Sequence, residues 1–233
     1  MNSFPAGDVA VVVGSAGGIG AALLAAIRET GRFSHTLELA RTTHPSIDLL
    51  DETSIAESAR WVASKGTPRL VIVASGLLHR DGISPEKSLR QLDPAVMSAM
   101  FAINTVGPAM VMKHFLPLLP RTGKAVFCAL SARVGSIGDN SLGGWFSYRA
   151  SKAALNQLIH TGAIDVGRRA RETICVALHP GTVDTTLSAP FHKGGLEVQT
   201  PAMASRRLLD VVDRLGITNS GGFFDQFGRT VPW

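Results

Sequence analysis

The stretch "DVAVVVGSAGGIG", Asp8–Gly20, decides the fold. Its first half is a continuous apolar run of strand length, which is typical of a strand buried on both faces of a parallel sheet. Its second half is a glycine-rich turn that leads into a helix-length segment. Such a turn lets the backbone approach a pyrophosphate, and the helix after it offers unpaired N–H groups and a positive dipole end. The stretch therefore predicts a β–α unit that binds a dinucleotide.

The spacing of the glycines leaves a second interpretation open. They follow the pattern G-x-x-x-G-x-G, which differs from the G-x-G-x-x-G of many dinucleotide binders. A tight strand–helix turn without a ligand would also favour glycine. The position of the turn at the first β–α junction favours the cofactor interpretation. The predicted phosphate-binding residues are Gly14, Ser15, Gly17, Gly18, Ile19 and Gly20.

Beyond this unit, apolar runs of strand length alternate with helix-length segments. The further predicted strands are "HTLELA", "RLVIVAS", "KAVFCALS", "TICVALHP" and "GGFFDQF", and one long helix is predicted from Asp93 to Leu119. This alternation predicts an α/β fold, a doubly wound Rossmann-type parallel sheet of about seven strands flanked by helices. The sequence contains no internal repeat or linker, so residues 1–233 are expected to form one domain.

Composition narrows the class of protein. Hydrophobic residues make up 45% of the chain and charged residues 18%, which is typical of a globular protein. The net charge is +5, but the basic residues are scattered, so we expect neither nucleic acid nor a membrane surface as partner. No N-terminal signal segment and no apolar run of ~18 residues is evident, which predicts no membrane insertion. The seven histidines show no metal-ligand spacing, so no metal site is expected.

The two cysteines, Cys128 and Cys175, each lie inside an apolar run. They do not form a framework of spaced cysteines of the kind that builds disulfide scaffolds. We therefore expect buried thiols and a cytoplasmic protein.

The end of the second strand bears on the choice of nucleotide. An acid there would bind the ribose hydroxyls of NAD, whereas an arginine would favour the 2′-phosphate of NADP. The strand ends in "LELART", with Arg41 and Thr42 at its tip and no acid. This favours NADP over NAD. A solvated arginine at a strand end is the alternative.

The stretch "GGWFSYRASKAALNQL", Gly143–Leu158, contains Tyr148, the only tyrosine of the chain, and Lys152. Residues four apart share a helix face. A cation near a phenol favours phenolate and lowers a pKa that is ordinarily near 10. Such a pair can exchange a proton with a substrate oxygen near neutral pH. The alternative is a surface aromatic–cation pair. The glycine-rich segment before Tyr148, and the fact that the chain has no other tyrosine, favour the catalytic interpretation.

Together these motifs resemble those of the short-chain dehydrogenases/reductases, and within that family the C-factor-like and sniffer-like carbonyl reductases. The resemblance covers nearly the whole chain and rests on "GSAGGIG", "YRASK", "FAINTVGP", "HPGTVDT" and the closing "GGFFDQFGRTVPW". It implies a nicotinamide cofactor and hydride transfer to or from a small carbonyl or alcohol substrate. Members of this family pair subunits through their two long helices, which implies a homodimer or homotetramer.

The resemblance also implies roles for single residues. Tyr148 would be the general acid/base, and Lys152 would bind the nicotinamide ribose and lower the pKa of the phenol. Asn104 would kink its helix and hold a water in a proton relay. Further cofactor contacts would come from Asp48 and Leu49 beside the adenine, from Ala74, Ser75 and Gly76 along its ribose, and from Pro180, Gly181, Val183 and Thr185 over the nicotinamide.

The chain departs from the family pattern at two places. It has Val73-Ala74-Ser75-Gly76 where the family usually has Asn-Asn-Ala-Gly. It also has Ala132 after Ser131, where the family usually has a second small polar residue. Ser131 is the first candidate for binding the substrate oxygen and Ser136 the second, while Ser131 as a mere strand cap is the alternative.

These departures motivate a second hypothesis, a cofactor-bound regulatory or signalling protein with little turnover. In either case, the substrate pocket is expected to be bounded by Leu77–Asp81, Gly135–Phe146 and Ser188–Thr200. Loops vary freely on such a fold, so they do not identify the substrate.

Overall fold

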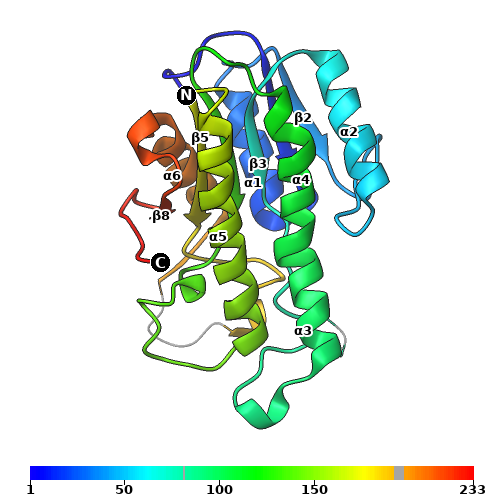
Figure 1. Ribbon diagram of the computed structural model, residues 1–233, viewed down its shortest axis with the longest axis vertical. Coiled ribbons are helices and arrows are strands. Elements are labelled where there is room, and N and C mark those ends of the chain that lie inside the picture. Colours follow the sequence, from blue (N-terminus) through cyan, green and yellow to red (C-terminus); the bar gives the residue numbers. More distant parts are fainter. Residues whose placement is uncertain (81, 192–196) are drawn as a thin grey trace.

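The computed structural model describes residues 1–80, 82–191 and 197–233, and its centre is a sheet of six parallel strands (Figure 1). The strand order is β2-β1-β3-β4-β5-β8. The strands are β1 (Val9–Val13), β2 (His35–Leu39), β3 (Pro68–Val73), β4 (Ala125–Leu130), β5 (Thr173–His179) and β8 (Phe223–Asp225). The doubly wound parallel sheet is confirmed, with six strands rather than about seven. Two further strands, β6 (Thr182–Val183) and β7 (Val198–Gln199), pair with each other in a separate ribbon.

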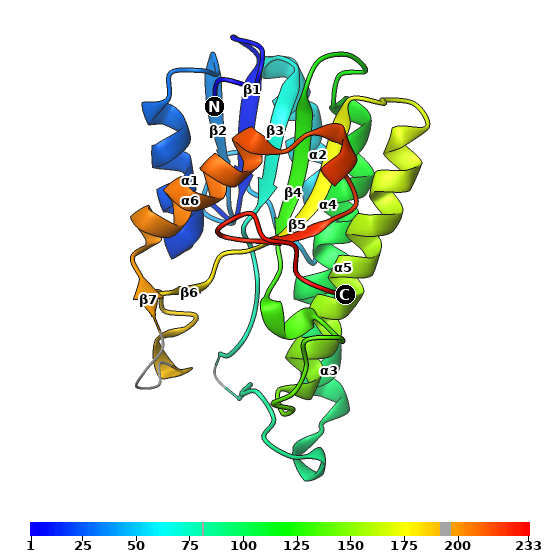
Figure 2. The ribbon, with the colours of Figure 1, turned by 90° about the vertical axis from the view of Figure 1, so that its left-hand side faces the viewer.

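Helices cover both faces of the sheet (Figure 2). One face carries α1 (Gly18–Glu29) and α6 (Pro201–Arg214), and the other carries α2 (Glu52–Lys65), α4 (Gly107–Phe115) and α5 (Phe146–Gly167). Strand β1 shows why its sequence is apolar throughout. Val11 belongs to the core cluster on the α2, α4 and α5 side, whereas Val12 belongs to the cluster on the α1 and α6 side. Burial on both faces removes the polar alternation of a half-exposed strand.

The predicted long helix is interrupted in its middle. It consists of α3 (Pro94–Phe101), a π-helical turn at Ala102–Val106 and α4. Asp93 starts α3 by accepting hydrogen bonds from the backbone N–H groups of Ala95 and Val96 at 2.8 and 3.0 Å. A single π turn widens the helix locally, and such turns are frequent at functional sites.

The expectation that no apolar segment is long enough to span a membrane is corrected at Pro94–Leu118. It spans 25 residues, and an 18-residue window in it reaches a mean hydropathy of 1.5, so its length and composition would allow it to cross a membrane. In the fold this segment packs against β3, α2 and α5. The apolar residues that raise its hydropathy include Val111 and Phe115, which belong to the core. Core helices of this kind satisfy the same hydropathy criterion as membrane spans.

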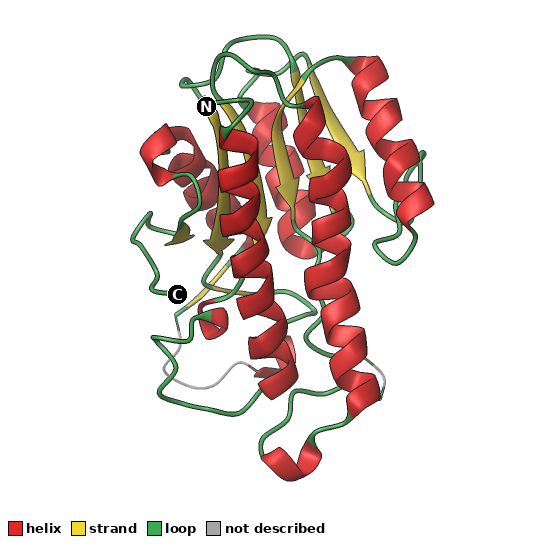
Figure 3. Cartoon of the chain, viewed as in Figure 1, coloured by secondary structure: helices red, strands yellow, loops and turns green. Residues whose placement is uncertain are grey.

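The chain reverses its winding direction between β1 and β3. It proceeds from β1 to β2 on one side and then crosses to β3 on the other side. The loops that follow the strands collect at the carboxyl edge of the sheet (Figure 3). In open α/β sheets, ligands bind in the crevice at such a switch point, so the topology places the candidate site beyond β1 and β3.

Candidate active site

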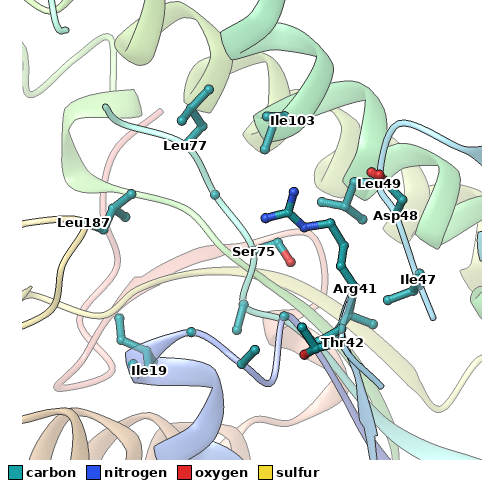
Figure 4. Close-up of a pocket in the computed structure, with 18 of the residues that line it drawn as sticks. Ile19, Arg41, Thr42, Ile47, Asp48, Leu49, Ser75, Leu77, Ile103 and Leu187 are labelled. Atoms are coloured by element: carbon teal, nitrogen blue, oxygen red, sulfur yellow. The ribbon is translucent and has the colours of Figure 1, made fainter. Parts of the chain in front are cut away.

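A cavity of about 550 Å³ opens at this switch point (Figure 4). Its walls come from the glycine-rich turn, the ends of β2 and β3, the π turn after α3 and the segment after β6. Most of the predicted cofactor-binding residues line it: Gly14, Gly17, Gly18, Ile19, Arg41, Asp48, Leu49, Ala74, Ser75, Gly76 and Thr185. Residues predicted from five separate stretches of sequence therefore share one cavity.

The glycine-rich turn brings backbone close to its neighbours. Gly14 has a φ of +87°, and a Cβ there would lie 2.5 Å from Ser75 Oγ. A Cβ on Gly18 would lie 2.8 Å from Thr185 Cγ2. Helix α1 begins after Gly17 without a side-chain cap and without an acid in its first turn. In the described part of the chain, no side chain caps its first N–H groups, which is the arrangement that binds phosphate.

Among the described residues, the charged side chains at the cavity are two arginines and one aspartate. Arg41 follows β2 and reaches across the cavity (Figure 4), with Thr42 beside it. The Asp48 carboxylate accepts a hydrogen bond from Leu50 N at 2.9 Å. Arg80 also lines the cavity, although it is not among the cofactor-binding residues predicted from the sequence. The signal that points to it is a basic residue in the loop directly after a strand expected to contact the nucleotide.

Other predicted cofactor residues lie outside the cavity walls. Ser15 is buried, and Pro180, Gly181 and Val183 lie between β5 and β6 or within β6. The carbonyl of Pro180 accepts a hydrogen bond from Gln199 Nε2 at 2.6 Å. This bond ties the segment after β5 to strand β7. Gly20 is also not among the cavity-lining residues, because it is buried against the backbone of Gly14.

Tyr148 and Lys152 lie one turn apart at the beginning of α5, and both are buried. Lys152 Nζ is 5.9 Å from the centre of the Tyr148 ring and donates a hydrogen bond to the Leu130 carbonyl at 2.9 Å. A Cβ on Gly76 would lie 3.6 Å from the same Nζ. Tyr148 and Lys152 are not among the residues that line the cavity, but Gly76, which does line it, lies next to the ammonium.

Burial moves the pKa values of this pair in opposite directions. Burial raises the pKa of Tyr148 above its usual value, and burial lowers the pKa of Lys152 to about 8. The expected lowering of the phenol pKa by the neighbouring cation is therefore wrong for this structure. Desolvation of the phenolate is the cause of the rise, and it outweighs any attraction from the neighbouring cation. Tyr148 is a protonated phenol at neutral pH.

The structure distinguishes the two candidate serines. Ser131 follows β4, and its Oγ is buried with no hydrogen-bond partner among the described residues. Ser136 Oγ instead accepts a hydrogen bond from Asp139 N at 3.0 Å, which holds its own loop. Leaving a buried hydroxyl unpaired costs about 1–3 kcal/mol. The free hydroxyl of Ser131 therefore fits a role in binding a substrate or cofactor oxygen, and that of Ser136 does not.

His179 lies beside Ser131, because β4 and β5 pair and end together. Its Nδ1 is also buried without a partner in the described part of the chain. Burial, with Arg133 nearby, lowers the pKa of His179 to about 4. This histidine is therefore neutral at physiological pH, and it adds a second polar group without a partner near the candidate serine.

Asn104 lies on the π turn and is fully buried. Its Oδ1 accepts from Leu77 N at 2.7 Å, and its Nδ2 donates to Leu77 O at 2.8 Å and to Ser151 Oγ at 3.1 Å. The side chain thus holds the loop after β3 against α5. It aligns the cavity residue Gly76 with the helix that carries Lys152.

Apolar side chains surround the Tyr148 ring. Trp145 lies edge-on to Tyr148 at 6.1 Å between ring centres, and Phe191 lies edge-on to Trp145 at 5.2 Å. His79 contacts Phe191 at 5.4 Å and hydrogen-bonds the Thr186 carbonyl at 3.0 Å. Three loops expected to bound the substrate pocket therefore meet here. Asp81 and residues 192–196, which belong to two of those loops, lie outside the described residues.

Comparisons with known proteins match most of the chain. A family model described as enoyl-(acyl carrier protein) reductase matches residues 19–209. The C-signal protein of Myxococcus xanthus is 37% identical over 147 residues, which cover 63% of this chain and 84% of that protein. The 1-hydroxy-2-glutathionyl-2-methyl-3-butene dehydrogenase of Rhodococcus sp. (strain AD45) is 30% identical over 192 residues, covering 82% and 80%.

Solved structures show the same fold. The structure of an NADPH-bound carbonyl reductase from chicken fatty liver superposes with a TM-score of 0.83 at 24% identity and covers 98% of this chain and 100% of that chain. Among the residues that the structure describes here, no group of three His, Cys, Asp or Glu side chains could hold a metal ion. The extent of the family match and of the dehydrogenase relative shows that the chain belongs to the short-chain dehydrogenase/reductase family of oxidoreductases.

Proposed function

We propose that the protein is an NADP-dependent oxidoreductase that transfers a hydride between the nicotinamide cofactor and a carbonyl or alcohol substrate. One observation carries the proposal: a buried tyrosine and lysine lie one helical turn apart, with the lysine next to Gly76 in the wall of a cavity that also contains the glycine-rich turn. The apolar rings around Tyr148 favour a substrate with an apolar body next to its carbonyl group.

The residues present fit a dinucleotide. The uncapped N-terminus of α1 would receive the pyrophosphate, and Arg41 with Thr42 would receive the 2′-phosphate of NADP. When bound, the cofactor supplies the hydride. The carbonyl reductase from chicken fatty liver, whose crystal structure contains NADPH, supports the same nucleotide here.

The chain's own residues would manage the substrate oxygen. Ser131 Oγ, which has no partner among the described residues, would donate a hydrogen bond to that oxygen and orient the carbonyl. Tyr148, protonated at neutral pH, would give its proton to the oxygen as the carbonyl carbon is reduced. Lys152, held by the Leu130 carbonyl, would return a proton from solvent to the phenolate, through a water that Asn104 would hold.

The direct test of this role is Tyr148→Phe. The variant keeps the ring and its contact with Trp145 but removes the phenol proton, so kcat should fall by about 10²–10⁴-fold, the usual worth of acid/base catalysis. NADPH oxidation with a panel of apolar aldehydes and ketones measures it. NADPH binding by fluorescence titration should stay unchanged, which separates lost chemistry from lost binding. A Tyr148→Phe enzyme with wild-type kcat would contradict the assignment.

Arg41→Ala tests the preference for NADPH over NADH. It should weaken NADPH binding about 10-fold or more and leave NADH binding unchanged, because only NADPH carries the 2′-phosphate. Fluorescence titration with both nucleotides measures this. Arg121→Ala, which changes an exposed arginine outside the cavity, is the matched control. Equal losses for both nucleotides would remove Arg41 from the 2′-phosphate site.

A second candidate function has its own support. Ala132 replaces a polar residue next to Ser131, and one relative is named C-signal. A signalling protein of this fold would bind NADPH without oxidising it across the carbonyl panel. The same titration and turnover measurements on the wild type therefore separate the two candidates.

We further propose that residues 1–233 act as one domain, in the cytoplasm, within a homodimer or homotetramer. The two buried thiols Cys128 and Cys175, which are unpaired, support the reducing compartment. The exposed faces of the long helices support the assembly, which is tested below.

A further inference from the structure

Glu86 is a buried carboxylate that the proposed chemistry does not use. It lies in the loop between β3 and α3 and is 3% exposed. No lysine, arginine or histidine pairs with it among residues 1–80, 82–191 and 197–233. A buried charge without a cation is costly unless hydrogen bonds compensate it. The hydrogen-bond partners of Glu86 therefore indicate the role of this buried side chain.

Its contacts converge on the first turn of α5. The carboxylate accepts hydrogen bonds from Ser147 N at 3.2 Å and from Ser147 Oγ. The Glu86 backbone carbonyl also accepts from Trp145 N at 2.5 Å. Trp145 is the N-cap residue of α5, has a φ of 53° in the left-handed region and supplies no side-chain cap. Glu86 thus provides, from 61 residues away, the cap that α5 lacks.

This turn carries the candidate proton donor. Tyr148 is the residue directly after Ser147, so the Glu86 hydrogen bonds fix the backbone from which the phenol projects. Arg149, in the same turn of α5, ties the helix to the preceding loops, because its guanidinium donates to the carbonyls of Val134, Gly143 and Gly144 at 3.2, 3.1 and 2.9 Å. The helix start is therefore fixed both by the Glu86 carboxylate and by a guanidinium of its own first turns.

The contacts with Ser147 place the Glu86 carboxylate at the N-terminal end of α5. The N-terminus of a helix carries a partial positive charge, which favours phenolate, and a carboxylate at that end offsets it. The other charged or titratable side chains around this turn are Lys152 and Arg149 on α5, Arg133 and Asp139 after β4, and His79, which reaches Tyr148 only through Phe191 and Trp145. Among these described residues, Glu86 is the acid that contacts the turn itself.

We propose that Glu86 is a positioning residue for Tyr148, which caps α5 and, through its negative charge, keeps the phenol protonated. This inference rests on the proposed function of Tyr148 as proton donor. It goes beyond that function, because it assigns the orientation and proton affinity of the donor to a residue 62 positions away in sequence.

Glu86→Gln tests the charge, because the amide keeps the shape and can still accept from Ser147. Tyr148 is the only tyrosine, so phenolate absorbance reports on this residue alone. After a rapid jump to about pH 12, read before the protein unfolds, the variant should show about a threefold higher ratio of phenolate to phenol than the wild type. Glu57→Gln, an exposed glutamate on α2, should match the wild type. Equal ratios in all three proteins would overturn the proposal.

Two further measurements keep the outcome decisive. If Glu86→Gln does not fold, Glu86→Asp replaces it, because this change withdraws the carboxylate by one methylene. Its ratio of phenolate to phenol should lie between the wild-type ratio and a threefold higher one, and a ratio equal to that of the wild type would contradict the proposal. With a carbonyl substrate, Glu86→Gln should move the alkaline limb of kcat for reduction to lower pH while the KM for NADPH stays unchanged. Absence of turnover in the wild type would defeat the proposed function alone, because the absorbance measurement needs no substrate.

Discussion

At the residue scale, the buried Lys152 lowers the free energy of unfolding at a position that the proposed chemistry requires. Burial lowers its pKa to about 8, whereas the unfolded chain has the ordinary value near 10.5. Below pH 8 the folded protein therefore holds a buried charge that costs up to about 3 kcal/mol. Lys152→Met should raise the free energy of unfolding at pH 7 by about 1–2 kcal/mol, because the lost hydrogen bond to Leu130 offsets part of the gain. Urea unfolding measures this change.

The pH dependence gives this prediction its sign. Between about pH 8 and 10.5 the unfolded chain binds more protons at Lys152 than the folded one, so wild-type stability rises relative to the variant. The advantage of Lys152→Met should therefore shrink over that window. Lys65→Met, at an exposed position on α2, is the control and should show no such trend. A pH-independent difference would mean that Lys152 is not desolvated as described.

At the scale of elements, the π turn at Ala102–Val106 joins the loop after β3 to α5 through Asn104. Asn104→Ala would leave the buried N–H and carbonyl of Leu77 without partners, which should lower the free energy of unfolding by about 2–4 kcal/mol. Urea denaturation measures this loss. The control Gln157→Ala, on the exposed face of α5, should change the free energy of unfolding by less than about 0.5 kcal/mol. A small effect of Asn104→Ala would show that the turn is held by the helix alone.

At the scale of the whole molecule, α4 and α5 run side by side on one face of the sheet (Figure 1), and their region leaves apolar side chains uncovered. Val106 is 51% exposed and Ile164 is 54% exposed. We expect this face to pair subunits, so light scattering should give the mass of a dimer or tetramer. Ile164→Glu should shift the mass towards the monomer, since a charge in an apolar interface is costly. Met203→Glu, on the opposite face, should not, and a monomeric wild type would contradict the assembly.

Local sequence determined the central strand, the glycine-rich turn and the pairing of Tyr148 with Lys152. The apolar run of β1 predicts a doubly buried strand because every side chain of such a strand meets a core, whichever face it points to. The glycines after it predict a phosphate-binding turn because only they allow the close approaches seen at Gly14 and Gly18. The spacing of Tyr148 and Lys152 predicts a shared helix face. Each of these features depends on residues within one or two turns of each other, so the chain itself carries the information.

Tertiary structure alone decided how the site works. Glu86 meets Ser147, and Asn104 meets Leu77, only after the loop after β3 has been laid against the helices. Neither contact has a periodicity that a sequence pattern could reveal. The rise in the pKa of Tyr148, opposite to the expectation from its neighbouring cation, has the same origin. Desolvation is the sum of everything packed around a group, and that sum exists only once distant segments have come together.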